Sequence, residues 1–328
     1  MFRSSNIQDG CIDYKDIVRV NKKVRENLIT KNGDLLICAR NGSSRLIGKN
    51  ALLHRTDANQ TFGAFMMVFR SDKNHFVHHL LNTKRYTSQV AENLGARINQ
   101  ITSSDLSSFR FFFPKDDKEM TRIASLFDLL DGRIAVQNRL IDRLQSLMKG
   151  IRHRIINEAK GKIVCLCEVS DIYQPQTISS ADLTETGYPV YGANGIIGHY
   201  TSYNHEAEQV CITCRGNTCG GVNYTKSKSW ITGNAMVVNV DRYQNIVSKR
   251  YIYHYLSNCD FNSIISGSSQ PQIVRAPLAK FKIILPTVMQ QYKIAHCLDV
   301  IQNKINVNSN ILNLLIRQKQ YLLRKMFI

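Results

Sequence analysis

The sequence predicts an α/β (α+β) fold: two mixed α/β domains separated by two long helices that pair as an antiparallel coiled coil. Two similar stretches, residues 95–160 and 267–328, each end in a long run with an apolar residue every third or fourth position. The segments before them contain short β-branched runs separated by Gly, Asn and Ser. A repeated unit with this change of period indicates that a globule followed by a helix occurs twice.

Length and composition are those of a globular protein with two domains. The chain has 328 residues, 43% of them hydrophobic, and carries a net charge of +18. Its longest apolar run, residues 62–69, is too short to cross a membrane, and its polar start has no signal-peptide core. Nine cysteines without regular spacing favour a reducing, cytoplasmic location. The positive charge indicates a polyanionic partner, with nucleic acid ahead of an acidic membrane.

The duplication can be followed position by position. From Gln100 and Gln272 to Pro114 and Pro286, the two copies align at a constant offset of 172. After the prolines the offset is 171, and it holds through the helical part. A register kept over this length indicates a duplicated unit.

Each helical part has apolar residues in alternating steps of three and four, which is coiled-coil spacing. Gln137 and Asn308 each place one amide in the apolar seam at the same slot, where a polar residue usually sets register. We therefore expect the two helices to pair with each other, antiparallel; two unrelated amphipathic helices on separate domains are the alternative. The predicted seam consists of Ile123, Phe127, Leu130, Ile134, Gln137, Ile141, Leu144, Ile294, Leu298, Ile301, Ile305, Asn308, Leu312 and Leu315.

The sequences of the globular parts predict strands followed by helices. Runs such as LLICARNGSS and VCITCRGNTCGG, and later AFMMVF and AMVVNV, predict strands within residues 33–69 and 209–240. Residues 76–92 and 248–257 predict helices. The expected domains are therefore a first globule at 1–113, a helix at 114–160, a second globule at 161–285 and a second helix at 286–328.

Motifs for catalysis are missing from the sequence. It contains no phosphate-binding loop, no dinucleotide fingerprint, no H-E-x-x-H zinc motif and no G-x-S-x-G elbow. His78 and His79 lie in a polar segment, and we expect them to be solvated. Cys211, Cys214 and Cys219, with two earlier cysteines, could form a zinc site, but a strand-like run favours core cysteines. We expect no catalytic residue, no metal and no cofactor.

A family resemblance rests on three segments. The run LPTVMQQYKIAHCLDVIQNKI, its first-copy relative FPKDDKEMTRIASLFDLLDGRIAVQNRLI, and YPVYGANGIIGHY at 188–200 together resemble the specificity subunit of type I restriction-modification systems. The run GSSQPQI before the second proline is also similar. The likeness covers nearly the whole chain, and the repeated P…[KR]IA…helix element makes it specific.

The resemblance implies a non-catalytic DNA-binding protein. Each globule would be a target recognition domain that reads one half of a bipartite site on double-stranded DNA, and the paired helices would set the gap between the halves. The implied protein partners are two DNA adenine methyltransferase subunits and, in the full complex, restriction subunits. The resemblance also implies that the first recognition domain is truncated, because residues 2–14 stand where the second copy has the YGANG loop, with almost nothing upstream.

Residues that could contact DNA lie in the expected loops. Arg and Lys suit guanine and phosphate, while Asn and Gln suit adenine. The candidates are Arg40, Asn41, Ser43, Arg45 and Lys49 in the first globule, and Asn194, His199, Arg215, Asn217, Lys226 and Lys228 in the second.

Three other hypotheses stay open from the sequence. The first is a coiled-coil scaffold whose globules bind protein, and the second is a metal- or thiol-dependent enzyme that uses the cysteines around Cys211. The third is a silent or partial phase-variation cassette of the same family.

Overall fold

The structure, a computed structural model, describes residues 1–8, 10–94, 99–267 and 269–327. Residue 268 of the GSSQPQI run and residue 328 of the expected second helix lie outside the described part. The chain divides into two compact units. Unit 1 comprises residues 1–139 and 310–328, and unit 2 comprises residues 140–309. Two long helices contribute to both units: α4 (Asp117–Glu158) and α7 (Val288–Met326).

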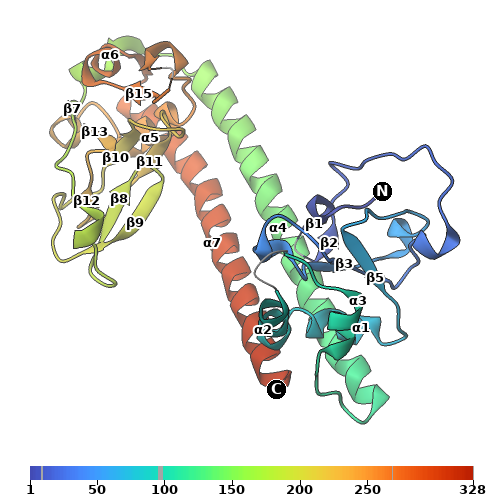
Figure 1. Cartoon of the computed structure of the whole chain (residues 1–328). Helices are drawn as coiled ribbons and strands as arrows, with labels where there is room; N and C mark the ends of the chain where they lie inside the picture. The colour runs from blue at the N-terminus through green and yellow to red at the C-terminus, as the bar shows by residue number, and fades with distance from the viewer. Residues whose placement is uncertain (9, 95–98, 268, 328) are drawn as a thin grey trace. The chain divides into compact units, whose positions relative to one another are not determined.

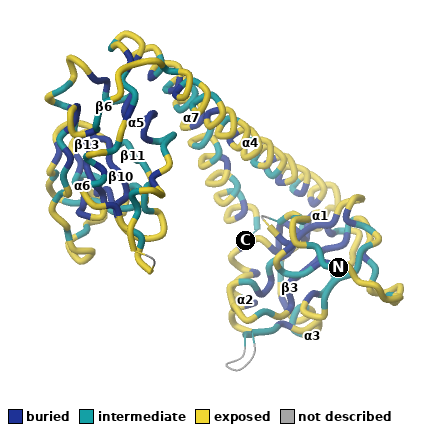
Figure 2. Tube along the Cα trace, turned by 90° about the horizontal axis from the view of Figure 1, so that it is seen from above, coloured by how far each residue is buried: buried dark blue, intermediate teal, exposed yellow. Residues whose placement is uncertain are grey.

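Unit 1 is built on a three-stranded antiparallel sheet in the order β4-β3-β5, beside a two-stranded hairpin of β1 and β2 (Figure 1). The central strand β3 is buried throughout (Figure 2), as its run of Leu, Leu, Ile and Cys predicts. The elements of unit 1 ahead of α4 are β1 (Ile7–Gln8), β2 (Cys11–Ile12), β3 (Leu35–Cys38), β4 (Asn50–Leu52), β5 (Met66–Phe69), α1 (Asn74–Leu80), α2 (Lys84–Asn93) and α3 (Ser103–Ser108).

The expected helix at 76–92 is in fact two helices, α1 and α2. Thr83 caps the second one, because its hydroxyl accepts a hydrogen bond from the backbone N–H of Tyr86. A threonine at this position stabilises the start of a helix because its hydroxyl pairs with one of the free backbone N–H groups of the first turn. The break lets α1 pack on the sheet and the ring of Tyr86 enter the core.

Unit 2 has a four-stranded antiparallel sheet in the order β11-β10-β13-β7 and a three-stranded sheet in the order β12-β8-β9. Strand β10 is buried throughout, and α5 packs beside it (Figures 1 and 2). The elements are β6 (Lys162–Cys165), β7 (Asp171–Tyr173), β8 (Tyr188–Gly192), β9 (Gly195–Tyr200), β10 (Val210–Thr213), β11 (Val222–Tyr224), β12 (Trp230–Ile231), β13 (Ala235–Asn239), α5 (Lys249–Leu256), β14 (Ile265–Ser266), β15 (Gln272–Ile273), α6 (Arg275–Ala279) and β16 (Lys282–Leu285).

The two units share one plan. Strand β3 corresponds to β10, β5 to β13, and α1 to α5, and each central strand is paired antiparallel on both sides. The hairpin of β1 and β2 corresponds to that of β8 and β9: a parallel bridge joins Phe2 to Phe62 where β8 pairs in parallel with β12. The predicted mixed α/β fold with a repeated unit is confirmed.

Unit 2 also has two strands for which the described residues of unit 1 show no paired equivalent. Strand β7 adds to the edge of β13, and β6 pairs with β16. In unit 1 the segment that matches β16 is in no strand, and the side chains of Phe112 and Phe113 are 70% and 48% exposed.

The long helices pack against each other within each unit. In unit 1, Phe127 of α4 contacts the region of Leu323 and Phe327, while Asp131, one turn later, meets Lys319, so the helices run antiparallel there. In unit 2, Met148 of α4 lies in a cluster with Leu298 and Ile305 of α7. Every one of the fourteen predicted seam residues is buried or half-buried. Within the described residues, no helix has the length and apolarity needed to cross a bilayer.

Candidate nucleic-acid interface

In unit 1, the five candidate DNA-contacting residues gather beyond the end of β3. Arg40 and Asn41 follow the strand, and the side-chain amide of Asn41 donates a hydrogen bond of 3.0 Å to the hydroxyl of Ser4. The carbonyl of the same side chain accepts from the backbone N–H of Ser43, which fixes the loop. Arg45 is exposed in the next turn, and the ammonium of Lys49 lies 3.5 Å from the side-chain oxygen of Gln8.

In unit 2, three of the six candidates lie at the equivalent end of β10. Arg215 and Asn217 are exposed in the loop after the strand. Asn194 is exposed at the turn between β8 and β9, and this turn is held to the same strand end because the hydroxyl of Thr213 donates to the carbonyl of Ala193. The hairpin turn and the loop therefore lie next to each other.

The remaining three candidates of unit 2 lie at the other end of its sheets. Because Val210 pairs with Tyr224, the residues after β11 lie beyond the start of β10. Lys226 is found there, and its backbone N–H donates to the hydroxyl of Tyr191 at 3.1 Å. Lys228 lies 3.9 Å from Glu206, and the backbone of His199 is bridged to Thr184. The structure thus separates the six candidates into two groups.

One bridge occurs in both units at the end of the central strand. Arg40 is paired antiparallel with Gln100, and Arg215 is paired antiparallel with Gln272. The next residues along extend the match: Ile101 N–H donates to the Ala39 carbonyl at 2.8 Å, and Ile273 N–H donates to that of Cys214 at 3.0 Å. The bridge fixes the backbone of each arginine, and both arginines are exposed.

Arg40 and Arg215 differ electrostatically from the cationic side chains that are held in ion pairs. Arg70, Lys249 and Arg250 are each held by a carboxylate, of Asp34, Asp241 and Asp299 respectively. Within the described residues, the side chains of Arg40, Arg45 and Arg215 form no ion pair. A fixed backbone carrying an unneutralised guanidinium can offer bidentate hydrogen bonds to a phosphate or a guanine edge.

Sequence reasoning missed two features of this surface. Arg275 lines a cavity of about 210 Å³ together with Gln174, Arg215 and Gln272. The equivalence of Arg40 and Arg215 was also missed, because it holds at an offset of 175 and not at the 172 of the better-matched segments. The common pattern of an apolar strand followed by Cys, Arg and Asn would have been the signal.

Comparison with known proteins finds similar sequences and similar structures. A model of the type I restriction modification DNA specificity domain matches residues 159–317, which contain nearly all of unit 2 and much of α7. Over 148 residues the chain is 31% identical to the type I restriction enzyme EcoprrI specificity subunit of Escherichia coli. That alignment covers 44% of this chain and 36% of the relative.

The matched residues resemble the type I restriction-modification specificity family. The chain is also 27% identical over 169 residues to the EcoKI specificity subunit of Escherichia coli K12, covering 50% of this chain and again 36% of the relative. The chain therefore aligns with little more than a third of the length of these curated relatives.

Two solved structures share the fold over nearly the whole chain. The S subunit of a type I restriction-modification system from M. genitalium superposes with a TM-score of 0.69 and 18% identity, covering 100% of this chain and 92% of the other. A chain from a structure on complex assembly and conformational transition of the type I R-M system gives 0.54 and 18% identity, covering 98% and 89%.

In the part of the chain that the structure describes, the thiols of Cys211 and Cys214 do not form a common site. Cys211 packs with Tyr191 and Val237, whereas Cys214 packs in the main core of unit 2, so the two side chains lie on opposite faces of the sheet. Burial raises the pKa of Cys211 to about 12. A neutral, buried thiol is neither a good ligand nor a good nucleophile, which argues against a thiol-dependent enzyme.

The expectation that His78 and His79 are solvated is wrong. Helix α1 packs both rings inward, leaving 6% of His78 and 0% of His79 exposed. The polar appearance of the segment was misleading because each buried imidazole has a polar partner at one of its nitrogens, Asn50 for His78 and Asp128 for His79. Buried polar groups are usually paired in this way.

Proposed function

We propose that the chain is the non-catalytic DNA-recognition subunit of a cytoplasmic type I restriction-modification complex. On this proposal, residues 1–113 and 161–285 are target recognition domains that each read one half of a bipartite target in double-stranded DNA. The spacers at 114–160 and 286–328 then set the distance between the halves. The observation that carries the proposal is the Arg–Gln bridge, repeated at the same strand end of both units.

The duplicated bridge supports DNA reading for a physical reason. An antiparallel bridge holds the backbone of Arg40 or Arg215 still, so that an exposed guanidinium can meet a base edge with little loss of entropy. Polar neighbours such as Asn41, Ser43, Asn194 and Asn217 would then supply the differences between the two half-sites. Lys226, Lys228 and His199, at the other strand end of unit 2, would contact phosphates farther along the duplex.

The proposed partners follow from the family. Two adenine methyltransferase subunits would bind the helices and adjacent surfaces, and restriction subunits would join in the full complex. The decisive experiment is to co-express the chain with its candidate methyltransferase and to map methylated adenines in the host genome. A split motif with a constant gap supports bipartite reading. Methylation at single undivided sites, or none in the presence of a stable complex, contradicts it.

A protein-binding scaffold is the second candidate, and one observation favours it. Apolar side chains remain exposed on both long helices, among them Leu129, Val136, Val307 and Leu314, at 69%, 56%, 57% and 62%. Salt separates the two functions, because phosphate contacts make affinity for DNA fall steeply as salt rises. Strong binding of a protein partner by a chain without salt-dependent DNA affinity would favour the scaffold.

A further inference from the structure

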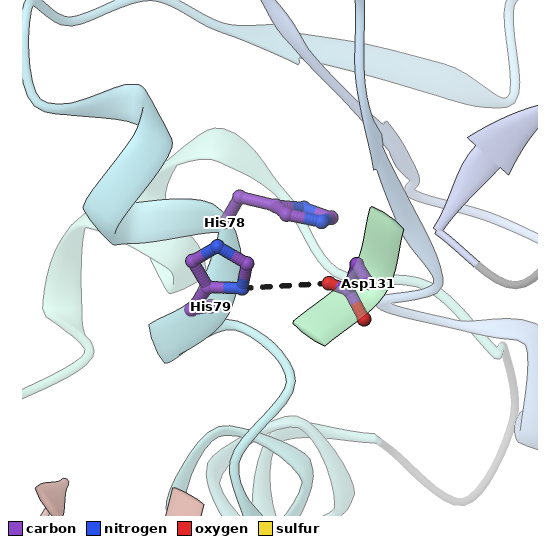
Figure 3. A group of neighbouring side chains, drawn as sticks. All are labelled: His78, His79 and Asp131. Carbon is purple, nitrogen blue, oxygen red and sulfur yellow. Dashed lines mark ion pairs between the residues drawn. The ribbon is translucent and has the colours of Figure 1, made fainter. Parts of the chain in front are cut away.

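Three metal-ligating side chains meet inside unit 1. His78 and His79 extend from α1, and Asp131 extends toward them from α4 (Figure 3). One nitrogen of each ring and one carboxylate oxygen all lie within 4.8 Å of one another. Two imidazoles and a carboxylate form a ligand set typical of zinc and similar transition-metal dications.

The ring of His79 is oriented as a ligand would be. Its Nε2 lies 2.9 Å from Oδ1 of Asp128, so the hydrogen belongs on Nε2. The other nitrogen, Nδ1, then carries a lone pair, and it is buried with no hydrogen-bond partner in the described structure. It lies 3.9 Å from Oδ2 of Asp131 (Figure 3). A carboxylate behind the non-ligating nitrogen is the usual support of a metal-bound histidine.

The ring of His78 is fixed in the same manner. The amide nitrogen of Asn50 donates to the carbonyls of Gly48 and Leu81, so its Oδ1 is available as an acceptor 3.1 Å from Nδ1 of His78. The hydrogen therefore belongs on Nδ1, which leaves a lone pair on Nε2.

We propose that Nε2 of His78, Nδ1 of His79 and Oδ2 of Asp131 bind one divalent transition-metal ion of the zinc class. Ligands around a tetrahedral zinc ion lie about 3.3 Å apart, so roughly an ångström of side-chain movement closes the site. Asp131 is half-buried, which leaves the fourth position open to water. The ion would link α1 to α4 and so stabilise the packing of α1 against the long helix within unit 1.

Lys319 is the competitor for this site. Its ammonium lies 2.5 Å from Oδ1 of Asp131, and its side chain is 19% exposed. With the ion on Oδ2, the lysine either keeps its bond to Oδ1 or turns outward to solvent. If the ammonium of Lys319 keeps the carboxylate of Asp131 occupied, no metal will bind.

Unit 2 provides an internal control. His254 corresponds to His79, contacts Asp299 through Nε2, and also has a buried Nδ1 without a partner in the described structure. However, Tyr253 stands at the position of His78, and Gln302 at that of Asp131. The unpaired nitrogen alone therefore does not indicate a metal. The proposal rests on the two additional ligands that only unit 1 has.

The test uses the full chain, stripped with a chelator and titrated with Zn²⁺ and then with Co²⁺. We expect one ion per chain, a rise in the melting temperature, and a Co²⁺ visible spectrum without the thiolate charge-transfer band that cysteine ligation would give. Asp131→Asn should abolish the binding of the ion, the rise in melting temperature and the Co²⁺ spectrum. Gln302→Glu changes the equivalent position of unit 2 and is the control, so it should leave metal binding at one ion per chain.

Lys319→Met keeps the proposal falsifiable if Asp131→Asn fails to fold. Removing the ammonium should preserve or tighten Co²⁺ binding. The proposal is overturned if neither the natural chain nor Lys319→Met binds an ion stoichiometrically. It is also overturned if His78→Gln, folded by circular dichroism, binds Co²⁺ as the natural chain does, or if the thiolate band accompanies binding.

Discussion

The imidazole of His254 lies 2.7 Å from a carboxylate oxygen of Asp299, and this contact joins α5 to α7 within unit 2. The ring is completely buried, and Arg250, one turn earlier on α5, binds the same carboxylate. Asp128 plays the equivalent part in unit 1, where it meets His79 and His75. In each unit, one aspartate of a long helix therefore contacts two side chains of the short helix that packs on the sheet, α1 in unit 1 and α5 in unit 2.

Stability should fall on the acid side because of His254. Burial is the main reason that its pKa falls from 6.5 to about 4, despite the opposing effect of Asp299. Between these values the unfolded chain binds a proton that the folded chain does not, so the stabilisation is complete above pH 6.5 and is lost as pH falls toward 4. The loss should reach about 2–3 kcal/mol. Urea unfolding of unit 2, followed at several pH values, measures it.

His254→Gln should flatten this dependence, since glutamine does not titrate in that range. His296→Gln, at an exposed position of α7, is the matched control and should leave the pH profile unchanged. A natural chain that is equally stable at pH 4.5 and pH 7 would contradict the assignment. So would a variant at His254 with the same slope as the natural chain.

The helix pairing in unit 2 should depend on Leu298. Its side chain is fully buried in the cluster with Met148, whereas Val300, two residues later, is 55% exposed. Leu298→Ala should lower the free energy of unfolding by about 2–5 kcal/mol, because it removes buried methyl groups and leaves a cavity. Val300→Ala should change it by no more than about 0.5 kcal/mol. Equal effects in denaturant unfolding would show that the seam is wrongly placed.

Two glycines should respond in opposite directions to alanine. Gly187 has a φ of +128°, and an added Cβ would collide with the backbone carbonyl of Tyr200, so Gly187→Ala should cost more than about 2 kcal/mol. Gly150 lies inside α4 with open space around it. Gly150→Ala should raise stability by about 0.5–1 kcal/mol through helix propensity. Melting temperatures of the two variants test the pair, and a loss at Gly150 would indicate an unseen contact.

DNA affinity should depend on Arg215. Arg215→Glu removes a guanidinium with no ion pair in the described structure, so it should weaken binding at low salt. It should also reduce the slope of log affinity against log salt by about 1 if the contact is to phosphate. Arg242→Glu makes the same change in charge at an exposed position beyond β13 and should have a smaller effect. Fluorescence anisotropy at several salt concentrations measures both, and unchanged affinity at low salt would remove Arg215 from the interface.

Local patterns predicted the elements of this protein well. The long helices were predicted because their three- and four-residue spacing is a property of consecutive residues, and α4 and α7 begin and end within three residues of the expected bounds. Strands β3 and β10 were predicted by short runs of buried apolar residues. The alignment of the two copies also placed Gln100 and Gln272 at matching positions, although it did not show that each is bridged to an arginine.

The sequence by itself therefore determined the repeat, the two long helices, the central strands and the family resemblance. Only the tertiary structure decided which side chains meet. Arg40 is bridged to Gln100, sixty residues away. His78 and His79 lie in a polar segment, yet they are buried near Asp128 and Asp131 of α4, about fifty residues later. Periodicity reports the face on which a residue lies, but the partner on that face depends on how distant segments pack. No window of neighbouring residues contains that information.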